Sequence, residues 1–401
     1  MELPSGFIEM AEELLKEETP LFLEAMRRPP EVSIRLNPRK PGAVTDGLEP
    51  VQWCPTGFYL PQRPVFTLDP LLHAGAYYVQ DASSMIYYEL TKKIITFLGN
   101  PERVTLLDLC AAPGGKTTAM IDALPDGSRV VANEYVAKRA GILRENLSRW
   151  GYPLATVTNR DSKAFAKEGG AFDIVAVDAP CSGEGMMRKE PAAIEQWSPR
   201  LIEQCAALQK EILANAAECV APGGFLIYST CTFNRLENEE NVEYAVRELG
   251  LESVDPFFPT EWNLLHAIGS DVHAFRFMPH RTRGEGLFLA LLRKPGDFEP
   301  SSFSPANRKK ESRFSSKNSK EAVVPEIEEI LSVDFDKKRF PLVEISKDRA
   351  LSYLRRESII LPEDSPRGIV ILTYKGLPLG AAKNIGSRAN NLYPKNRRIR
   401  L

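Results

Sequence analysis

Short β-branched runs alternate with amphipathic windows through the middle of the chain, between residues 104 and 294. Six runs have the composition of buried strands: VTLLDL, SRVVANE, LATVTN, FDIVAVD, GFLIYST and EGLFLALL. Three windows place apolar residues at helical spacing: VAKRAGILRENLSRW, SPRLIEQCAALQKEILANAAECV and RLENEENVEYAVREL. Strands that alternate with helices predict an α/β fold with a doubly wound, mostly parallel sheet.

The pattern divides the rest of the chain into smaller units. Residues 1–75 mix short helical patterns with Pro-rich connections and predict a small α+β extension, so that the principal domain covers residues 76–295. Residues 296–325 are rich in Ser, Pro, Asn and Lys and predict a basic linker. Residues 326–401 return to strand and helix patterns and end in the basic tail NLYPKNRRIRL.

Composition limits the class of protein. The chain has 401 residues, of which 43% are hydrophobic and 26% charged, enough for at least one large core. No apolar run is long enough for a bilayer, and the N-terminus has no basic start, so we expect a cytoplasmic protein without membrane contact. Six cysteines without a C-x-x-C pair predict neither a disulfide framework nor a metal site.

The stretch LLDLCAAPGGKTTAM contains a glycine turn between a predicted strand and a predicted helix. It is not a phosphate-binding P-loop, because Cys110 stands where that motif needs its first glycine. The strand ends in Asp108, and Gly114 and Gly115 would let a ligand approach the backbone at the carboxyl end of the sheet. The next strand ends in Glu134, an acid that suits a ribose diol. Together these features favour a nucleoside-containing cofactor over a simple packing turn.

Two cysteines each follow a predicted strand of the same sheet. Cys181 ends the stretch FDIVAVDAPC, where Pro180 keeps the preceding residue extended, and Cys231 lies in GGFLIYSTCTFNRLENEENVE. Their thiols could therefore share one crevice. A thiol is needed when the target is carbon 5 of a pyrimidine, because that carbon becomes nucleophilic only after a thiolate adds at carbon 6.

The motifs DLCAAPGGKT, VDAPCSGEG and YSTCTFNRLENE resemble those of the Sun-type family of S-adenosylmethionine-dependent RNA cytosine carbon-5 methyltransferases. The resemblance covers residues 30–295 and includes VSIRLNPRK, YYVQDASSM and RFMPHRTRGEGLFLALLRK. The opening LPSGFIEMAEELL and the Tyr-Pro-Lys tail are most similar to the bacterial group that methylates 16S ribosomal RNA. The resemblance implies a Rossmann-like sheet with an antiparallel last strand, an RNA-contacting N-terminal extension and a C-terminal β-rich PUA-like domain.

The resemblance also implies roles for individual residues. Cys231 would attack carbon 6, Cys181 would help remove the carbon-5 proton and release the enzyme, and Asp178 with Lys116 would assist at the cytosine. Asp161 would end the third strand and face the adenine. The residues that would line the S-adenosylmethionine site are Cys110, Ala111, Ala112, Pro113, Gly114, Gly115, Lys116, Glu134, Asp161 and Asp178.

Other conspicuous residues favour simpler interpretations. Cys205 and Cys219 lie in a helical window and predict core positions, and Cys54 predicts a loop position. His266, His273 and His280 do not form a metal array, because Gly269 and Pro279 interrupt any helix between them. For His280 an RNA contact stays an alternative to packing.

The expected partner is RNA, most simply ribosomal RNA or the small ribosomal subunit, bound by a monomer. The basic segment 308–320 and the tail 388–400 favour phosphate contact. Two alternatives stay open: a transfer RNA methyltransferase with the same chemistry, and a ribosome-assembly factor that binds without turnover. Retention of both Cys181 and Cys231 disfavours the second, since binding alone needs neither thiol.

Overall fold

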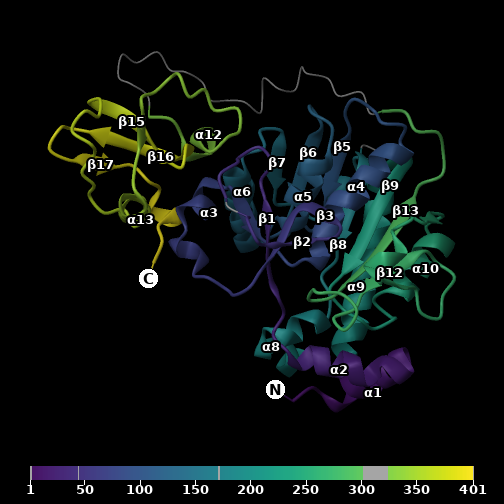
Figure 1. Cartoon of the computed structure of the whole chain (residues 1–401). Helices are drawn as coiled ribbons and strands as arrows, with labels where there is room; N and C mark the ends of the chain where they lie inside the picture. The colour runs from purple at the N-terminus through teal and green to yellow at the C-terminus, as the bar shows by residue number, and fades with distance from the viewer. Residues whose placement is uncertain (1, 44, 170–171, 301–323, 401) are drawn as a thin grey trace.

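A mixed sheet forms the centre of the molecule (Figure 1). The computed structural model describes residues 2–43, 45–169, 172–300 and 324–400, and within them this sheet has nine strands. Five parallel strands stand in the order β9-β8-β5-β6-β7: β5 (Thr105–Asp108), β6 (Arg129–Asn133), β7 (Ala155–Thr158), β8 (Phe172–Asp178) and β9 (Val220–Thr230). Next to β9 the sheet turns antiparallel: β13 (Leu287–Arg293), β12 (Ala274–Phe277), β11 (Leu265–His266) and β10 (Glu252–Val254). The predicted sheet, parallel with an antiparallel last strand, is confirmed.

Helices cover both faces of this sheet. Leu106 and Ile174 enter one core, while their neighbours Leu107 and Val175 enter another, because successive strand residues point to opposite faces. The first core includes side chains of α4 (Ile86–Phe97), α5 (Gly115–Ala123) and α6 (Ala137–Trp150). The second includes side chains of α7 (Ser162–Ala166), α9 (Pro199–Cys219) and α10 (Glu239–Arg247). Both faces are therefore buried, and the carboxyl ends of the parallel strands meet at one edge.

The first two helices pack against loops of the central domain. Side chains of α1 (Ser5–Leu15) and α2 (Thr19–Arg27), which are joined by η1 (Lys16–Glu18), form a core with α8 (Pro191–Gln196) and nearby aromatic residues. The ring of Phe22 lies 5.1 Å from that of Phe233, and the ring of Phe7 lies 6.0 Å from that of Trp197. Figure 1 shows α1 and α2 beside α8.

A four-stranded sheet in the order β2-β3-β1-β4 follows these helices. Its strands are β1 (Val32–Leu36), β2 (Glu49–Val51), β3 (Cys54–Leu60) and β4 (Tyr77–Val79), with α3 (Pro70–Ala74) before the last. Because β4 belongs to this sheet, the sheet continues beyond residue 75, where the sequence pattern predicts the end of the extension. The prediction that Cys54 lies in a loop is wrong: the residue begins β3 and is fully buried, because its strand packs on the core beneath α4.

The C-terminal unit is a second small sheet, in the order β14-β15-β16-β17. It consists of β14 (Leu342–Glu344), β15 (Gly368–Tyr374), β16 (Leu377–Asn384) and β17 (Ala389–Asn391), with α12 (Ile327–Ile330) and α13 (Lys347–Leu354). Its core is shared with the N-terminal sheet, since Ile34 and Tyr77 cluster with Tyr353 and Leu372. Residues 301–323, which include the predicted basic segment 308–320, lie outside the described residues.

Short 3₁₀ turns complete the described chain: η2 (Phe66–Leu68), η3 (Ser83–Met85), η4 (Glu184–Arg188), η5 (Thr260–Trp262) and η7 (Lys395–Arg397). None of the helices in the described ranges is both long and apolar enough to cross a membrane.

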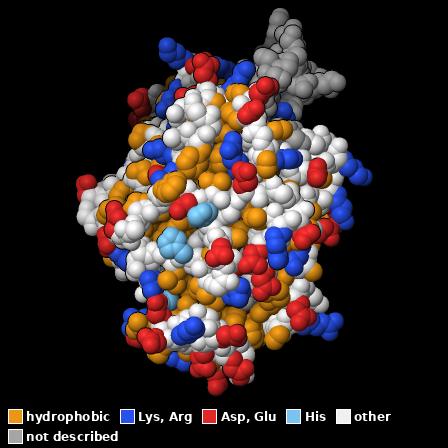
Figure 2. All heavy atoms as spheres, turned by 90° about the vertical axis from the view of Figure 1, so that its right-hand side faces the viewer, with side chains coloured by type: hydrophobic (Ala, Val, Ile, Leu, Met, Phe, Trp, Pro, Cys, Tyr) orange, Lys and Arg blue, Asp and Glu red, His pale blue; other side chains and the backbone are white. Residues whose placement is uncertain are grey.

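The face that carries α10 and β12 is shown in Figure 2, where basic and acidic side chains are interspersed. Among the described residues, that face therefore shows no extended region of positive charge.

Candidate active site

The two cysteines that follow β8 and β9 lie in contact. Cys181 and Cys231 are fifty residues apart in the sequence, but their strands are parallel neighbours, so both loops leave the sheet at the same edge. The two sulfur atoms are 3.3 Å apart. Both cysteines are free and half-buried. The structure thus brings together the two thiols that the sequence singles out.

The loop after β8 is shaped around the backbone of Cys231. Gly185 donates its N–H to the carbonyl oxygen of Cys231 at 2.8 Å. A Cβ at Gly185 would lie 2.9 Å from that oxygen and 3.0 Å from the carbonyl oxygen of Glu285. Gly183, two residues earlier, has a φ of +73°, a left-handed conformation that glycine adopts without strain. The glycines of SGEG therefore allow the two cysteine loops to approach each other.

Asp178 ends β8 and is held from both sides. Its Oδ1 accepts a hydrogen bond from Ser229 Oγ at 2.7 Å, and its Oδ2 lies 2.8 Å from Lys116 Nζ. Ser229 Oγ also lies 2.7 Å from the hydroxyl of the buried Tyr87. Burial alone would lower the pKa of Lys116, but the Asp178 carboxylate outweighs it and raises that pKa. Lys116 is therefore a protonated amine directed at the end of β8.

The thiols differ in their electrostatic surroundings. The pKa of Cys181 lies well above the usual thiol value, because the side chain is hydrogen bonded to Cys231 and buried, and because the charge of Glu237 is close. Lys116 lies near Cys231, and the attraction between them contributes to the raised pKa of Lys116. This asymmetry favours Cys181 as the thiol that keeps its proton.

The glycine turn lies between β5 and α5. Ala111 donates its N–H to the carbonyl oxygen of Asn133 at 2.8 Å, which holds the turn against the end of β6. Gly114 has a φ of +110°, and α5 begins at Gly115. A Cβ at Gly115 would lie 3.3 Å from the ring of Tyr78. The small size of Gly115 therefore lets Tyr78 of the N-terminal sheet approach the start of α5.

Acidic residues follow the neighbouring strands. Asp108 ends β5 and accepts a hydrogen bond from Thr117 at 2.6 Å, and burial raises its pKa to about 7. Glu134 directly follows β6 and is only 3% exposed. The prediction that Asp161 ends the third strand is wrong: β7 ends at Thr158, and Asp161 caps α7 by accepting the N–H of Lys163 at 2.9 Å. The chain leaves β7 early because an aspartate is a favoured helix cap.

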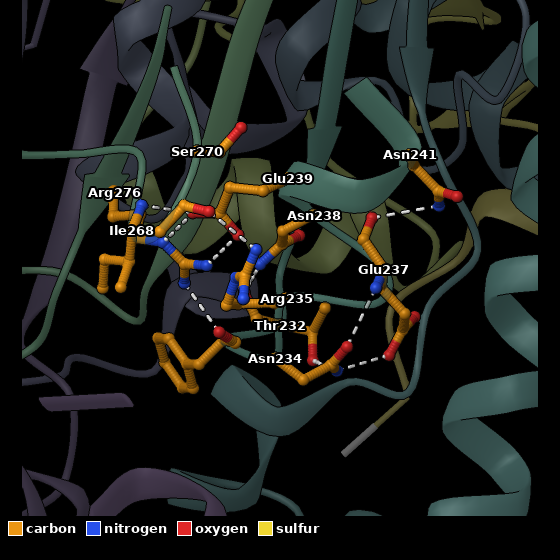
Figure 3. A network of polar contacts seen from close by, with 12 residues as sticks. Thr232, Asn234, Arg235, Glu237, Asn238, Glu239, Asn241, Ile268, Ser270 and Arg276 are labelled. Carbon is orange, nitrogen blue, oxygen red and sulfur yellow. Dashed lines mark hydrogen bonds and ion pairs between the residues drawn. The ribbon is translucent and has the colours of Figure 1, made fainter. Parts of the chain in front are cut away.

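Sequence reasoning missed several residues that hold the site. Ser229 lies inside the quoted YSTCT motif, two residues before Cys231, so its position was a usable signal. Tyr87 and Glu237 are fully buried polar residues in helix-like windows, and no local pattern distinguishes them. Figure 3 shows Glu237 in a network with Asn234 and Thr232, in the segment that follows Cys231.

The remaining candidates lie outside this cluster. Cys205 and Cys219 are in α9, half-buried and buried respectively. The His280 side chain is only 4% exposed, and its Nε2 lies 2.8 Å from a carboxylate oxygen of Glu18. It therefore packs against the N-terminal helices. No group of three or more His, Cys, Asp or Glu side chains suited to a metal ion occurs among the described residues.

Family models match three parts of the chain. The model for 16S rRNA methyltransferase RsmB/F matches residues 95–293. The model for the N-terminal domain of 16S rRNA methyltransferase RsmF matches residues 3–82, and the model for the methyltransferase RsmF PUA domain matches residues 340–399. The matches follow the order of the three units in the structure.

Curated relatives match over nearly the whole length. The ribosomal RNA small subunit methyltransferase F of Cronobacter sakazakii is 32% identical over 98% of this chain and 96% of its own length. The protein of the same name from Erwinia tasmaniensis is 30% identical, with the same two coverages.

Solved structures match most of the chain. PH0851 has a TM-score of 0.64 at 27% identity and covers 73% of this chain and 66% of that chain. NSun6 from Pyrococcus horikoshii, solved with the S-adenosylmethionine analogue SFG, has a TM-score of 0.61 at 22% identity, over 73% of this chain and 99% of that one. The second likeness concerns the fold.

Proposed function

Because this chain belongs to the RsmB/F family of 16S rRNA methyltransferases, we propose that it methylates carbon 5 of a cytosine in 16S rRNA through a covalent cysteine–cytosine intermediate. S-adenosylmethionine is the methyl donor. The observation that carries the proposal is the pair of thiols, 3.3 Å apart, at the ends of β8 and β9. Methylation of an exocyclic amine or a ribose would need no thiol, whereas carbon 5 needs one to become nucleophilic.

Cys231 is the nucleophile in this proposal. It adds to carbon 6, and electron density then reaches carbon 5. The assignment is supported by the raised pKa of Cys181, which keeps that neighbour a thiol that can donate its S–H to Cys231. It is also supported by the cationic Lys116 nearby, because a positive charge favours a thiolate.

Cys181 acts after the methyl group has been transferred. Bond formation to carbon 6 weakens Cys231 as a hydrogen-bond partner and removes its negative charge, and both of these contribute to the raised pKa of Cys181. Cys181, which is only half-buried, can then pass its proton to solvent water. The resulting thiolate takes the proton from carbon 5, the electron pair of that C–H bond forms the double bond between carbons 5 and 6, and the bond from carbon 6 to Cys231 breaks. The same pair of thiols thus serves addition and release in turn.

Asp178 and Lys116 orient the target base. Each oxygen of Asp178 accepts one hydrogen bond, from Ser229 or from Lys116, and keeps a lone pair. We assign that capacity to the amino edge of the cytosine, where a hydrogen bond favours electron flow into the ring. The base must leave its stack to reach this position, so a loop or single-stranded junction is the expected substrate.

The residues around the strand ends fit the cofactor. The Oε2 atom of Glu134 meets Arg139 Nη1 at 3.4 Å, beyond usual hydrogen-bond length, and so keeps acceptor capacity for ribose hydroxyls. When bound, S-adenosylmethionine supplies the methyl group. We propose that it is held by Glu134, Asp161 and Asp178 together with the turn of Cys110, Ala111, Ala112, Pro113, Gly114, Gly115 and Lys116.

The two smaller units contact RNA in this proposal, and the enzyme acts as a monomer. A monomer is supported because a single chain contains both thiols and all the proposed cofactor residues. Ribosomal RNA as substrate also favours a cytoplasmic location. A transfer RNA substrate is disfavoured by the names of the relatives, which are small subunit methyltransferases.

Bisulfite sequencing of RNA tests the function directly. Total RNA from cells with and without the gene should differ at a cytosine of 16S rRNA, which resists conversion only when the gene is present. Identical conversion of all 16S cytosines, with loss of protection in a transfer RNA, would move the activity to the alternative substrate.

A further inference from the structure

Three glutamates lie fully buried beside the cysteine loops, and the reaction proposed above uses none of them. Glu184, Glu237 and Glu239 are each 0% exposed. A buried carboxylate is costly unless it is paired or fully hydrogen bonded. Glu239 is paired with Arg276, whose Nε lies 2.7 Å from Oε1. Among the described residues Glu184 and Glu237 contact no cation, so hydrogen bonds alone stabilise them.

Glu237 accepts hydrogen bonds from both cysteine loops. Its Oε2 accepts the backbone N–H of Ser182, the residue after Cys181, at 3.0 Å. Its Oε1 accepts from Ser182 Oγ and, at 2.7 Å, from Nδ2 of Asn234, three residues after Cys231. Figure 3 shows the bond between Glu237 and Asn234. One carboxylate therefore joins the segment after β8 to the segment after β9.

Neighbouring contacts make this joint rigid. Gln209 in α9 donates to Glu237 Oε2 at 2.7 Å and to the carbonyl oxygen of Pro180 at 2.9 Å. The hydroxyls of Ser182 and Thr232 lie 2.8 Å apart. Each cysteine is therefore followed by a residue that is hydrogen bonded to the other loop or to Glu237.

Glu184 makes a comparable set of contacts, but among the described residues it has no hydrogen bond to Ser182, the residue next to Cys181. It accepts from the backbone N–H groups of Phe233 and Asn234 and from Nε1 of Trp197, which packs against the N-terminal helices. Glu237 instead contacts the residue next to Cys181 through both backbone and side chain. On the other side of the thiol pair, Lys116, which is paired with Asp178, lies near Cys231.

We propose that Glu237 is a positioning residue for the reaction: by joining the two loops it holds Cys181 in contact with Cys231. The charge of Glu237 beside Cys181 also helps to raise the pKa of that thiol, after its hydrogen bond to Cys231 and its burial. The inference rests on the proposed function for its catalytic meaning. Its structural content, the distance between two thiols and their order of reactivity, can be measured without RNA or cofactor.

The first test is disulfide formation in the full-length protein. Diamide takes up the two hydrogens that Cys181 and Cys231 lose when they form a disulfide, and non-reducing peptide mapping identifies that linkage. We expect Glu237→Gln to slow this reaction about tenfold or more, because a small misplacement of reacting atoms is costly. Glu240→Gln is the matched control, since Glu240 lies three residues later and is half-buried. It should react like the parent.

The second readout is the order of alkylation. Iodoacetamide reacts with thiolates, so the parent should be modified first at Cys231, and Glu237→Gln should shift modification toward Cys181. A purely structural role would not exchange the two sites. A folded Glu237→Gln protein with the parent's disulfide rate and alkylation order would overturn the proposal.

If Glu237→Gln does not fold, the Ser182→Ala variant tests the same proposal. It removes the hydroxyl bonds to Glu237 and Thr232 but keeps the backbone bond, so disulfide formation should slow in the same direction. A parent rate there would equally refute the role of Glu237. If the variants form the disulfide slowly but the parent protein itself leaves 16S rRNA unmodified, the positioning role is supported and the proposed reaction is refuted.

Discussion

At the scale of single residues, the difference between the two thiols decides the chemistry. Cys181 and Cys231 follow adjacent strands and touch, yet Cys181 lies near the carboxylate of Glu237 and Cys231 near the amine of Lys116. A negative neighbour favours the thiol and a positive one favours the thiolate. In the proposed reaction, the same residue type therefore takes two roles because its surroundings differ.

Alanine at each cysteine should separate these roles. Cys231→Ala cannot form the adduct, so it should neither methylate RNA nor remain attached to it under denaturing conditions. Cys181→Ala can still add and methylate, but it should stall before release. It should accumulate as a protein–RNA adduct on a denaturing gel when S-adenosylmethionine and target RNA are both present.

The two changes are chemically identical, so a general loss of stability would not produce opposite behaviour. An adduct from Cys231→Ala and none from Cys181→Ala would reverse the assigned roles. Methylation that persists in both variants without any adduct would refute the covalent mechanism.

Glu134 should contribute directly to cofactor affinity. If its carboxylate accepts from the ribose hydroxyls, Glu134→Ala should weaken binding of S-adenosylhomocysteine by about 1.5–3 kcal/mol, the usual contribution of a hydrogen bond to a charged group. Isothermal calorimetry measures this directly. Unchanged affinity in a folded variant would show that the acid only serves its contacts with Val136 and Arg139.

Asp108 should make stability depend on pH. Its pKa is raised by burial from 3.8 to about 7, so between these values the unfolded chain has lost a proton that the folded protein keeps. Stability from this group therefore falls as the pH rises through that window. The difference in free energy of unfolding between Asp108→Asn and the parent should therefore change by about 2 kcal/mol in favour of the variant when the pH rises from 5 to 8. Urea unfolding at both pH values checks this, and an equal difference at the two would contradict it.

At the scale of elements, the cysteine loops depend on glycine where the backbones meet. The loop after β8 passes so close to Cys231 that a side chain at Gly185 meets two carbonyl oxygens. Backbone atoms cannot move aside as a flexible side chain can, so the loop itself would have to shift. The thiol pair is therefore sensitive to a residue that carries no functional group.

Gly185→Ala should abolish adduct formation, or reduce its rate about a hundredfold, by displacing the Cys231 loop. Gly141→Ala is the matched control, because Gly141 lies within α6 and a Cβ added there would meet nothing within 4 Å. The control should keep activity and gain about 0.5–1 kcal/mol of stability, measured by thermal unfolding. Full activity of Gly185→Ala would mean that the loop tolerates the shift.

At the scale of the whole molecule, a buried lysine joins the C-terminal unit to the rest of the chain by hydrogen bonds to backbone carbonyl oxygens. The Lys40 amine donates to the carbonyl oxygens of Arg149 at 2.7 Å and Leu331 at 2.6 Å, joining three separate segments. The C-terminal sheet therefore keeps a defined place beside α6, and its basic residues can serve as a fixed RNA contact.

Three arginines of the C-terminal unit should bind RNA phosphates. Arg355, Arg398 and Arg400 line an open surface hollow of about 400 Å³ together with one acid, Glu357, and the three arginines have no ion-pair partner within the described ranges. Replacing Arg398 and Arg400 with Gln should weaken RNA binding and flatten its salt dependence, because fewer counterions are released. Arg397→Gln is the control, since Arg397 already pairs with Glu328. The mixed charge of the face in Figure 2 makes that face a poorer candidate. A parent salt slope in the double variant would exclude this contact.

The sequence alone predicted the parallel sheet and the placement of Cys181 and Cys231 just after its strands. Both rest on local signals, since strand composition and helical periodicity repeat within a few residues. Local signals failed at Cys54, where strand burial depends on a distant helix, and at Asp161, where a helix cap replaces the strand end. They also left Glu237 unassigned, because nothing in its window distinguishes a buried carboxylate from a solvated one.

Tertiary structure alone decided which residues meet. The contact of the two sulfurs follows from the pairing of β8 with β9, a long-range event that no spacing encodes. Ser229 is hydrogen bonded to Asp178, and Glu237 is hydrogen bonded to both loops. These bonds depend on burial, because buried groups are shielded from water that would compete for them. The sequence by itself determined the two cysteines and the strands that they follow, whereas packing decided the distance between them and the charged groups beside each, on which their proposed roles rest.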